Sequence, residues 1–239
     1  MEKQNLPLSI FYPVYNDWGT IASMVAESII TAEKITKDYE IILVDDGSRE
    51  KTKDILKFLD AQYPQVRVIT HEKNRGYGGA LRTGFREASK EYIFYTDGDA
   101  QYDVRELQLL VNGLNGNVDV VNGWKIKRHD PLYRIWLGKI YQYTAKILFS
   151  LPIRDVDCDF RLIRKSAFDG IQLQSNSGTI CVEMIHKLAR NGAQFAEVPV
   201  THFFRTSGKS EFFNFKRLLR VARDFSALWF RLVVLKRKD

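Results

Sequence analysis

Short apolar runs and amphipathic stretches alternate along the first half of the chain. The apolar runs each predict a buried strand, at residues 8–12, 40–44, 66–69, 92–95 and 118–121. Between the runs, apolar residues recur with helical spacing at residues 18–35, 51–62, 79–89 and 104–114. This alternation predicts an α/β fold, in which a mostly parallel sheet is covered by helices on both faces. Ligands of such folds bind beyond the carboxyl ends of the strands.

The second half of the chain is less regular. An amphipathic stretch at 131–149 is followed by a short strand at 160–163, a helix at 179–191 and a strand at 194–198. A long basic amphipathic helix is predicted at 211–235. No internal repeat, low-complexity tract or linker rich in Pro and Gly interrupts the 239 residues. We therefore expect one large domain.

Charge and composition narrow the class of protein. The net charge of +7 suits nucleic acid, anionic lipid or a phosphate-bearing substrate. The aromatic residues fall in apolar runs and form no nucleic-acid-binding motif, so we expect no nucleic-acid partner. Two cysteines without paired spacing, and a charged N-terminus without an apolar segment, favour a cytoplasmic protein. No apolar run reaches the roughly 18 residues that would span a bilayer.

Polar signatures follow four of the predicted strands. They are P-V-Y-N-D at 13–17, V-D-D-G-S at 44–48, N-R-G at 74–76 and D-G-D-A-Q at 97–101. Each segment alone is weak, because Asp-Gly-Ser after a strand is commonly a turn that leads into a capped helix. Together, at the ends of strands that share one sheet edge, they predict a ligand site.

Asp97 and Asp99 carry the sharpest chemical signal. Two carboxylates at i and i+2 beside a strand end can reach one divalent cation, and Gln101 adds an amide oxygen. Such oxygen ligands suit Mg²⁺ or Mn²⁺, and the cation would hold a departing diphosphate. The structural alternative is a helix capped by Asp103 with solvated acids nearby. No Walker A sequence is present, so nucleotide binding must come from separate loops.

Taken together with R-T-S-G-K-S at 205–210, these segments resemble the family 2 glycosyltransferases of the GT-A fold. Within that family the chain is most similar to the dolichyl- or polyprenyl-phosphate mannose and glucose synthases. The resemblance implies a single GT-A domain over residues 1–239. It further implies a nucleotide-sugar-binding half at 1–125, an acceptor-binding half at 126–210 and a C-terminal amphipathic helix at 211–239.

The resemblance also implies roles for individual residues. The nucleotide-sugar contacts would be Pro13, Tyr15, Asp17, Asp46, Asn74, Gly76, Asp97, Gly98 and Asp99. The cofactor, Mn²⁺ or Mg²⁺, would be bound by Asp97, Asp99 and Gln101. The acceptor and diphosphate contacts would be Lys125, Arg134, Arg205, Lys209 and Ser210. Asp99, Arg205 and Glu183 would be the catalytic residues.

Some positions depart from the family pattern. Lys125 follows Gly-Trp where the family often has Gly-Ser-Arg. Arg134 resembles an arginine that contacts the acceptor phosphate in the family, but one helical turn later Gly138 stands where the family often has serine. This difference weakens the assignment of a lipid phosphate as the acceptor. Asp159 precedes Phe160 where glycine or alanine is common, and it adds an acid whose effect the sequence does not predict.

The implied reaction is an inverting hexose transfer from a GDP-mannose or UDP-glucose type of donor to a polyprenyl or dolichyl phosphate. A phosphate acceptor, with a second pKa near roughly 6, is mostly ionised and needs no base. A saccharide or other hydroxyl acceptor would need one, with Glu183, Asp155 and Asp159 as candidates. Glu183 could equally make a structural contact. A non-catalytic nucleotide-sugar-binding or membrane-adaptor protein is a third hypothesis, which intact Asp97, Asp99 and Arg205 argue against.

A membrane surface is suggested by the last predicted helix. Its apolar stripe comprises Phe215, Leu218, Leu219, Ala222, Phe225, Trp229 and Leu232, and basic residues flank it. Leu132, Trp136 and Tyr143 offer a second surface. We therefore expect a peripheral protein on the cytoplasmic face of an anionic membrane, with a possible membrane-anchoring partner subunit. The alternative is a terminal helix that packs on its own domain.

Overall fold

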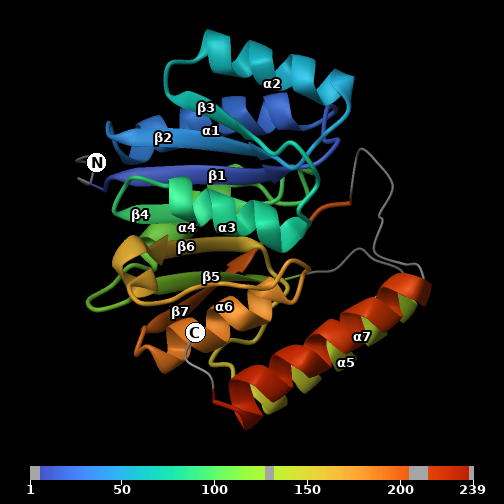
Figure 1. The fold of residues 1–239 in the computed structure, drawn as a ribbon. Coiled ribbons are helices and arrows are strands. Elements are labelled where there is room, and N and C mark those ends of the chain that lie inside the picture. Colours follow the sequence, from blue (N-terminus) through green and yellow to red (C-terminus); the bar gives the residue numbers. More distant parts are fainter. Residues whose placement is uncertain (1–5, 127–131, 205–214, 237–239) are drawn as a thin grey trace.

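The computed structural model describes residues 6–126, 132–204 and 215–236. Their centre is a seven-stranded sheet in the order β3-β2-β1-β4-β6-β5-β7 (Figure 1). The strands are β1 (Leu8–Val14), β2 (Tyr39–Asp45), β3 (Val66–Thr70), β4 (Tyr92–Thr96), β5 (Val120–Lys125), β6 (Phe160–Arg164) and β7 (Phe195–Val200).

The sheet is mostly parallel, as the sequence predicts. β1 pairs in parallel with β2 and β4, β2 with β3, and β5 with β7. β6 alone runs against its neighbours, β4 and β5. The carboxyl ends of the other six strands therefore share one edge of the sheet, together with the amino end of β6.

Helices cover both faces of the sheet (Figure 1). One apolar layer contains buried residues of α1 (Ile21–Ile35), α2 (Glu50–Gln62) and α4 (Leu107–Asn112), which follows the short helix η1 (Val104–Glu106). The other contains residues of α3 (Tyr77–Glu87), α5 (Leu132–Phe149), α6 (Ile180–Arg190) and α7 (Phe215–Trp229). A further short helix, η2, is Lys165–Phe168. Since layers cover both faces, all seven residues of β1 are buried, which explains its continuous apolar run.

The last predicted helix differs from expectation in its secondary structure and in what its apolar side contacts. It is two elements, α7 and a π-helical turn η3 (Phe230–Val234), in which Leu235 N donates to Phe230 O at 2.9 Å. Phe225, a member of the apolar stripe, is buried between Tyr141 and Phe149 of α5, with ring centroids 5.4 and 5.2 Å away. Leu232 is buried as well. Two residues of the stripe, Phe225 and Leu232, therefore pack on the domain, as in the alternative interpretation.

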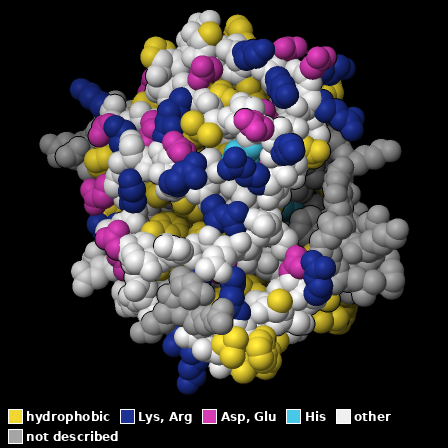
Figure 2. Space-filling model, viewed as in Figure 1, with side chains coloured by type: hydrophobic (Ala, Val, Ile, Leu, Met, Phe, Trp, Pro, Cys, Tyr) yellow, Lys and Arg dark blue, Asp and Glu magenta, His cyan; other side chains and the backbone are white. Residues whose placement is uncertain are grey.

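An exposed apolar surface lies on α5, the helix that carries Trp136 and Tyr143 of the second surface suggested by the sequence. Trp136, Ile140, Tyr143 and Ile147 are 68%, 59%, 67% and 75% exposed. Their spacing of four, three and four residues places them on one side of the helix, and we call them the α5 ridge. Hydrophobic side chains gather over the α5–α7 pair at the lower edge of the molecule in Figure 2. Within the described ranges, no helix has the length and apolar character needed to cross a membrane.

The packing of α7 can be tested with Phe225→Ala. Removing this buried ring should lower the free energy of unfolding by about 3 kcal/mol or more, because the ring leaves a cavity between two helices. Phe230→Ala is the matched control, since Phe230 is 53% exposed, and it should cost less than about 1 kcal/mol. Urea denaturation measures both. Equal losses would contradict the packing of α7 on α5.

Candidate active site

The loops that follow β1 and β4 meet at the carboxyl edge of the sheet. Thr20 Oγ1 donates to Gly98 O at 2.6 Å, which ties the two loops together. Asp17 accepts a hydrogen bond from Tyr15 N at 3.0 Å, and a Cβ on Gly98 would lie 3.6 Å from Asp17 Oδ2. Pro13 is buried in β1, whereas Tyr15 is 44% exposed. The structure thus brings the first and fourth sequence signatures side by side.

Asp46, after β2, organises the loop that follows β3. Its Oδ1 accepts from His71 Nδ1 and from Arg75 N, both at 2.7 Å, and its backbone oxygen accepts from Asn74 Nδ2 at 3.0 Å. Only 4% of Asp46 is exposed. A contact with the nucleobase stays a prediction for Asp46, whereas its hold on this loop is a role that the sequence analysis missed. His71, a single histidine just beyond a strand, was the available signal.

The loop after β3 packs tightly against residues 174–176. A Cβ at Gly76 would come within 2.5 Å of Asn176 O, and one at Gly78 within 2.2 Å of Ser175 O. Gly76 also has a φ of +79°, so this close approach requires glycine. Between the two glycines, Tyr77 donates from its hydroxyl to Asp97 Oδ1 at 2.9 Å. The loop therefore reaches Asp97, which together with Asp99 we call the acid pair.

Glu183 holds residues 174–176 in place. Its carboxylate, which is fully buried, accepts from Ser175 N at 2.7 Å and Gln174 N at 3.1 Å. Ion pairs with Lys187 at 3.2 Å and Arg231 at 3.1 Å complete its surroundings. Burial would raise the pKa of Glu183, yet the hydrogen bonds from Ser175 and the charge of Lys187 hold this pKa below its usual value. A carboxylate so committed is a poor proton acceptor, which favours the structural interpretation over catalysis.

Asp159, just before β6, lies next to the acid pair, which follows the neighbouring strand β4. β4 and β6 are antiparallel and their last pair is Thr96 with Phe160, so the next residues along are Asp97 and Asp159. Burial and the neighbouring charges of Asp159 and Asp99 raise the pKa of Asp97 well above its usual range. The departure from the family pattern at Asp159 therefore adds negative charge directly to the site.

The acid pair fits a divalent cation. Carboxylate oxygens are the ligands that Mg²⁺ and Mn²⁺ prefer, and Mg²⁺ is commonly bound by one or two carboxylates plus substrate phosphates. Among the residues that the structure describes, no three His, Cys, Asp or Glu side chains converge as a metal site. Asp97 and Asp99 are the two carboxylates that could share such a cation with a bound diphosphate. The side-chain nitrogen of Gln101 donates to Phe203 O at 3.2 Å, so only its amide oxygen could serve as the expected ligand.

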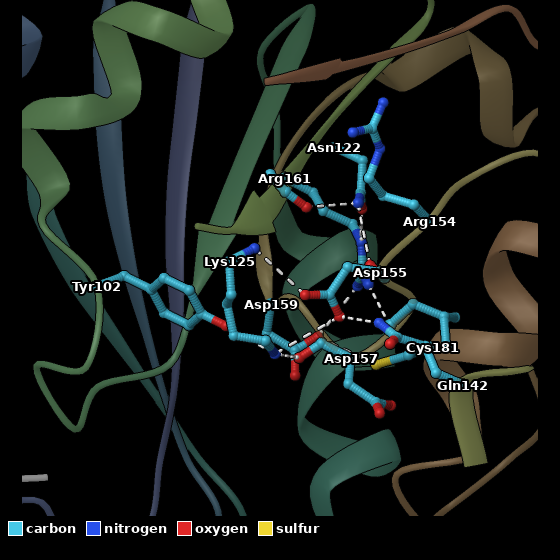
Figure 3. A network of polar contacts seen from close by, with 12 residues as sticks. Tyr102, Asn122, Lys125, Gln142, Arg154, Asp155, Asp157, Asp159, Arg161 and Cys181 are labelled. Carbon is cyan, nitrogen blue, oxygen red and sulfur yellow. Dashed lines mark hydrogen bonds and ion pairs between the residues drawn. The ribbon is translucent and has the colours of Figure 1, made fainter. Parts of the chain in front are cut away.

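Arg161 is the centre of a buried polar network (Figure 3). Its guanidinium contacts Asp159 Oδ1 at 3.0 Å and also reaches the Tyr95 hydroxyl, Asn122 Oδ1 and Val156 O. The same carboxylate oxygen of Asp159 lies 3.1 Å from Cys181 Sγ. Asp159 is thus the counter-ion of a fully buried arginine as well as a neighbour of Asp97.

Lys125 points into this network, which differs from the phosphate contact expected of it. Its ammonium donates to Asp157 O at 2.6 Å and lies 3.6 Å from Asp155 Oδ1 (Figure 3). The Lys125 side chain is only 7% exposed. Asp155 in turn accepts from Gln142 of α5 at 2.6 Å, so this candidate base is also engaged. A phosphate could reach Lys125 only if these contacts were broken.

We call residues 97–101, which follow β4, the acid loop. This loop also contacts the residues that follow β7 and precede the R-T-S-G-K-S segment. Phe203 N donates to Gln101 O at 2.8 Å, and Tyr102 forms a β-bridge with His202. Residues 202 and 203, the last ones before the segment that these contacts place, therefore lie beside the acid loop. Arg205, Lys209 and Ser210 lie outside the described residues, as does the side chain of Arg134, whose backbone is part of α5.

Comparisons with known proteins agree with this arrangement. The chain is 27% identical to undecaprenyl-phosphate 4-deoxy-4-formamido-L-arabinose transferase of Photorhabdus laumondii subsp. laumondii, over 91% of this chain and 66% of the relative. The protein of the same name from Edwardsiella ictaluri is 28% identical over 86% and 62%. The chain thus spans less than two thirds of the length of these relatives.

Solved structures support the fold. Glucosyl-3-phosphoglycerate synthase from Mycobacterium tuberculosis, in complex with Mn²⁺, UDP and glucosyl-3-phosphoglycerate, superposes with a TM-score of 0.71 at 16% identity. The match covers 95% of this chain and 79% of that chain. The same enzyme with Mg²⁺ and UDP gives a TM-score of 0.70 at 13% identity. These likenesses establish the GT-A fold that the sequence predicts.

The sequence profile of the family "Glycosyl transferase family 2" matches residues 9–171, which include the loops after β1, β2, β3 and β4 and the residues around Asp159. The acid loop, its glycine-lined neighbour and the polar segment before β6 all lie within this match. The chain therefore belongs to glycosyl transferase family 2.

Proposed function

We propose that this chain catalyses inverting transfer of a sugar from a nucleoside-diphosphate donor to a polyprenyl phosphate at a membrane surface. The observation that carries the proposal is the meeting of Asp17, Asp97 and Asp99 at the carboxyl edge of the sheet. The names of the two relatives described above, both undecaprenyl-phosphate sugar transferases, support the acceptor. They also name a formamido-arabinose, so we include such a sugar, beside the hexoses that the sequence suggests, among the proposed donors.

The proposed chemistry depends on charge at the leaving diphosphate. Asp97 and Asp99 would hold Mn²⁺ or Mg²⁺, which when bound neutralises negative charge on the departing nucleoside diphosphate. Arg205, Lys209 and Ser210 would close over the same group, because residues 202 and 203, shortly before them in the chain, contact the acid loop. Charges and hydrogen-bond donors that are fixed in place before the reaction stabilise the developing negative charge most strongly where water is excluded.

A phosphate acceptor agrees with the state of the candidate bases. Glu183 and Asp155 are committed to internal partners, and a phosphate monoester, with a second pKa near roughly 6, needs no base at neutral pH. Asp159 is engaged as well, with Arg161 at 3.0 Å, but among the three candidates it is the one that lies opposite Asp97, where a base for a hydroxyl acceptor would be needed. Transfer to a saccharide is therefore the second candidate function, with Asp159 as its base.

The membrane contact would be made by the α5 ridge. Tryptophan and tyrosine are enriched at membrane interfaces, and the ridge presents Trp136 and Tyr143 beside Ile140 and Ile147. We place the protein on the cytoplasmic face of an anionic membrane, where a membrane-anchoring subunit could hold it. α7 would support the ridge from behind through Phe225.

The transfer reaction is tested with Asp99→Asn, assayed with Mn²⁺, a panel of UDP- and GDP-sugars including a formamido-arabinose donor, and a short polyprenyl phosphate. Transfer should fall by at least about a hundredfold, because the substitution removes a charged ligand from the cation. Asp103→Asn is the control, since Asp103 caps η1 outside the acid pair, and it should retain activity.

The outcomes separate the hypotheses. Transfer to lipid phosphate that Asp99→Asn abolishes would support the proposal and identify the donor. Donor hydrolysis without lipid transfer would point to the hydroxyl acceptor. Absence of both donor binding and turnover in the wild type would exclude the catalytic function.

The positioning role of Glu183 is tested with Glu183→Gln. The variant leaves Arg231 and Lys187 without their buried counter-charge, so the free energy of unfolding should fall by about 3 kcal/mol. Folded variant should show a raised KM for the donor and a nearly unchanged kcat, whereas loss of a general base would lower kcat by at least about a hundredfold. Glu91→Gln removes a half-exposed pair with Arg164 and should cost less than about 1 kcal/mol.

The pH dependence of the stability of wild type and Glu183→Gln gives an independent check. Because the folded pKa of Glu183 is lowered, its stabilisation should be complete above about pH 4.3, the usual pKa of glutamate. It should be lost as the pH falls further through the lower folded pKa. The stability difference between wild type and Glu183→Gln should therefore shrink below about pH 4.3, and a constant difference would argue against the ion pairs as its source.

The membrane contact is tested by flotation with vesicles that contain anionic lipid. Ile140→Asp combined with Tyr143→Asp should weaken binding at least about tenfold, since both side chains would leave the apolar phase. Phe58→Asp, at a 61% exposed apolar position on α2, is the control and should bind like the wild type. Equal loss in both variants would show that the α5 ridge is not the contact.

A further inference from the structure

A cavity separate from the acid loop lies where the end of α5, the second half of α6 and η3 come together. Its volume is about 270 Å³, and it is partly open to solvent. The lining residues are Leu148, Phe149, Ser150, His186, Ala189, Arg190 and Val233. The cavity is thus mostly apolar, with an imidazole and a guanidinium as its two strong polar groups.

His186, one of the lining residues, carries a buried ring nitrogen without a hydrogen-bond partner among the described residues. Only 6% of the residue is exposed, and its Nδ1 lies 2.8 Å from Phe149 O. A carbonyl oxygen only accepts, so Nδ1 carries the proton and Nε2 offers its lone pair. Nε2 is buried and has no hydrogen-bond partner among the residues that the structure describes. Burial, together with the charges of Arg190 and Lys187, lowers the pKa of His186 and keeps the ring neutral.

A buried acceptor of this kind points to a ligand that donates. Leaving it unpaired costs free energy comparable to a lost hydrogen bond, which a hydroxyl group on a bound molecule would recover. Arg190, an exposed cation on the cavity wall, supplies the matching attraction for an anionic oxygen. The two groups together select a ligand that has both a hydroxyl and a negative charge.

The surroundings of the cavity indicate that this ligand has a hydrocarbon part. Ile147, the last residue of the α5 ridge, is 75% exposed, and the adjacent Leu148 is 36% exposed. On the other side, Val234 and Leu235, which follow Val233, are 46% and 49% exposed. η3 is a π-helical turn, a local irregularity that often accompanies functional sites. An exposed apolar rim around a polar pocket suits an amphiphile.

We propose that this cavity binds the headgroup of a hydroxyl-bearing anionic phospholipid. The headgroup hydroxyl donates to His186 Nε2, a phosphate oxygen faces Arg190, and the acyl chains lie along the apolar rim. The site is distinct from the proposed polyprenyl-phosphate site at the acid loop. It would fix the depth and orientation of the α5 ridge at the membrane and make vesicle binding depend on lipid headgroup.

The proposal is tested by calorimetric titration with dihexanoyl-phosphatidylglycerol below its micelle concentration, which does not require a membrane. The wild type should bind it at least about tenfold more tightly than dihexanoyl-phosphatidylcholine, which lacks both the hydroxyl groups and the net charge. Ala189→Trp, which fills the cavity, and Arg190→Gln should each weaken binding at least about fivefold. Arg223→Gln, a charge removal at a 76% exposed side chain of α7, is the control and should bind normally.

Three results would overturn the proposal: equal affinity for the two lipids, wild-type affinity in Ala189→Trp, or equally tight binding of sn-glycerol 3-phosphate, which has no acyl chains. Because Ala189 and Arg190 lie outside the acid loop, both variants should retain wild-type sugar transfer. Loss of lipid binding with retained transfer would therefore be independent of the proposed reaction.

Discussion

The antiparallel pairing of β4 with β6 is the constraint on which the site depends. Since the other strands run in parallel, their carboxyl ends meet at one edge, and only a reversed strand can bring its amino end there. The polar residues just before β6 therefore join the loops after β1 and β4. Asp159 comes to face Asp97, and Arg161, one residue into the strand, supplies the buried positive charge that Asp159 requires.

A second set of contacts links the helical layer to the acid pair. Glu183 holds residues 174–176, these pack against Gly76 and Gly78, and Tyr77 between the glycines donates to Asp97. Arg231 extends this connection to η3 at the end of the α7 segment. The loop that holds the two acids thus rests on a buried carboxylate whose partners are all internal. Such support matters because transfer reactions depend on fixed charge positions.

The lower part of the molecule combines packing with exposure in a way that the two amphipathic helices divide between them. Phe225 of α7 packs on Tyr141 and Phe149 of α5, and α5 has a second apolar side, the ridge, that is exposed. The polyprenyl-phosphate proposal requires the acid loop to work near lipid, and the α5 ridge gives the domain a surface for that contact. Gln142 connects α5 to Asp155, and so to the polar network behind the site.

The sequence by itself determined the fold class, the positions of most strands and helices, and the acid pair of the site. These follow from local periodicity and from the rule that parallel strands place their carboxyl ends at one edge. Only the tertiary structure decided that Lys125 points inward to Asp155, that Glu183 and Asp46 hold loops, and that Asp159 faces Asp97. An amphipathic pattern likewise shows that a helix has an apolar side but not what covers it. Only the structure decided that, of the two surfaces the sequence offered, Phe225 and Leu232 are buried whereas Trp136 and Tyr143 are exposed. Each of these outcomes depends on residues far apart in the chain, whose contacts no local pattern encodes.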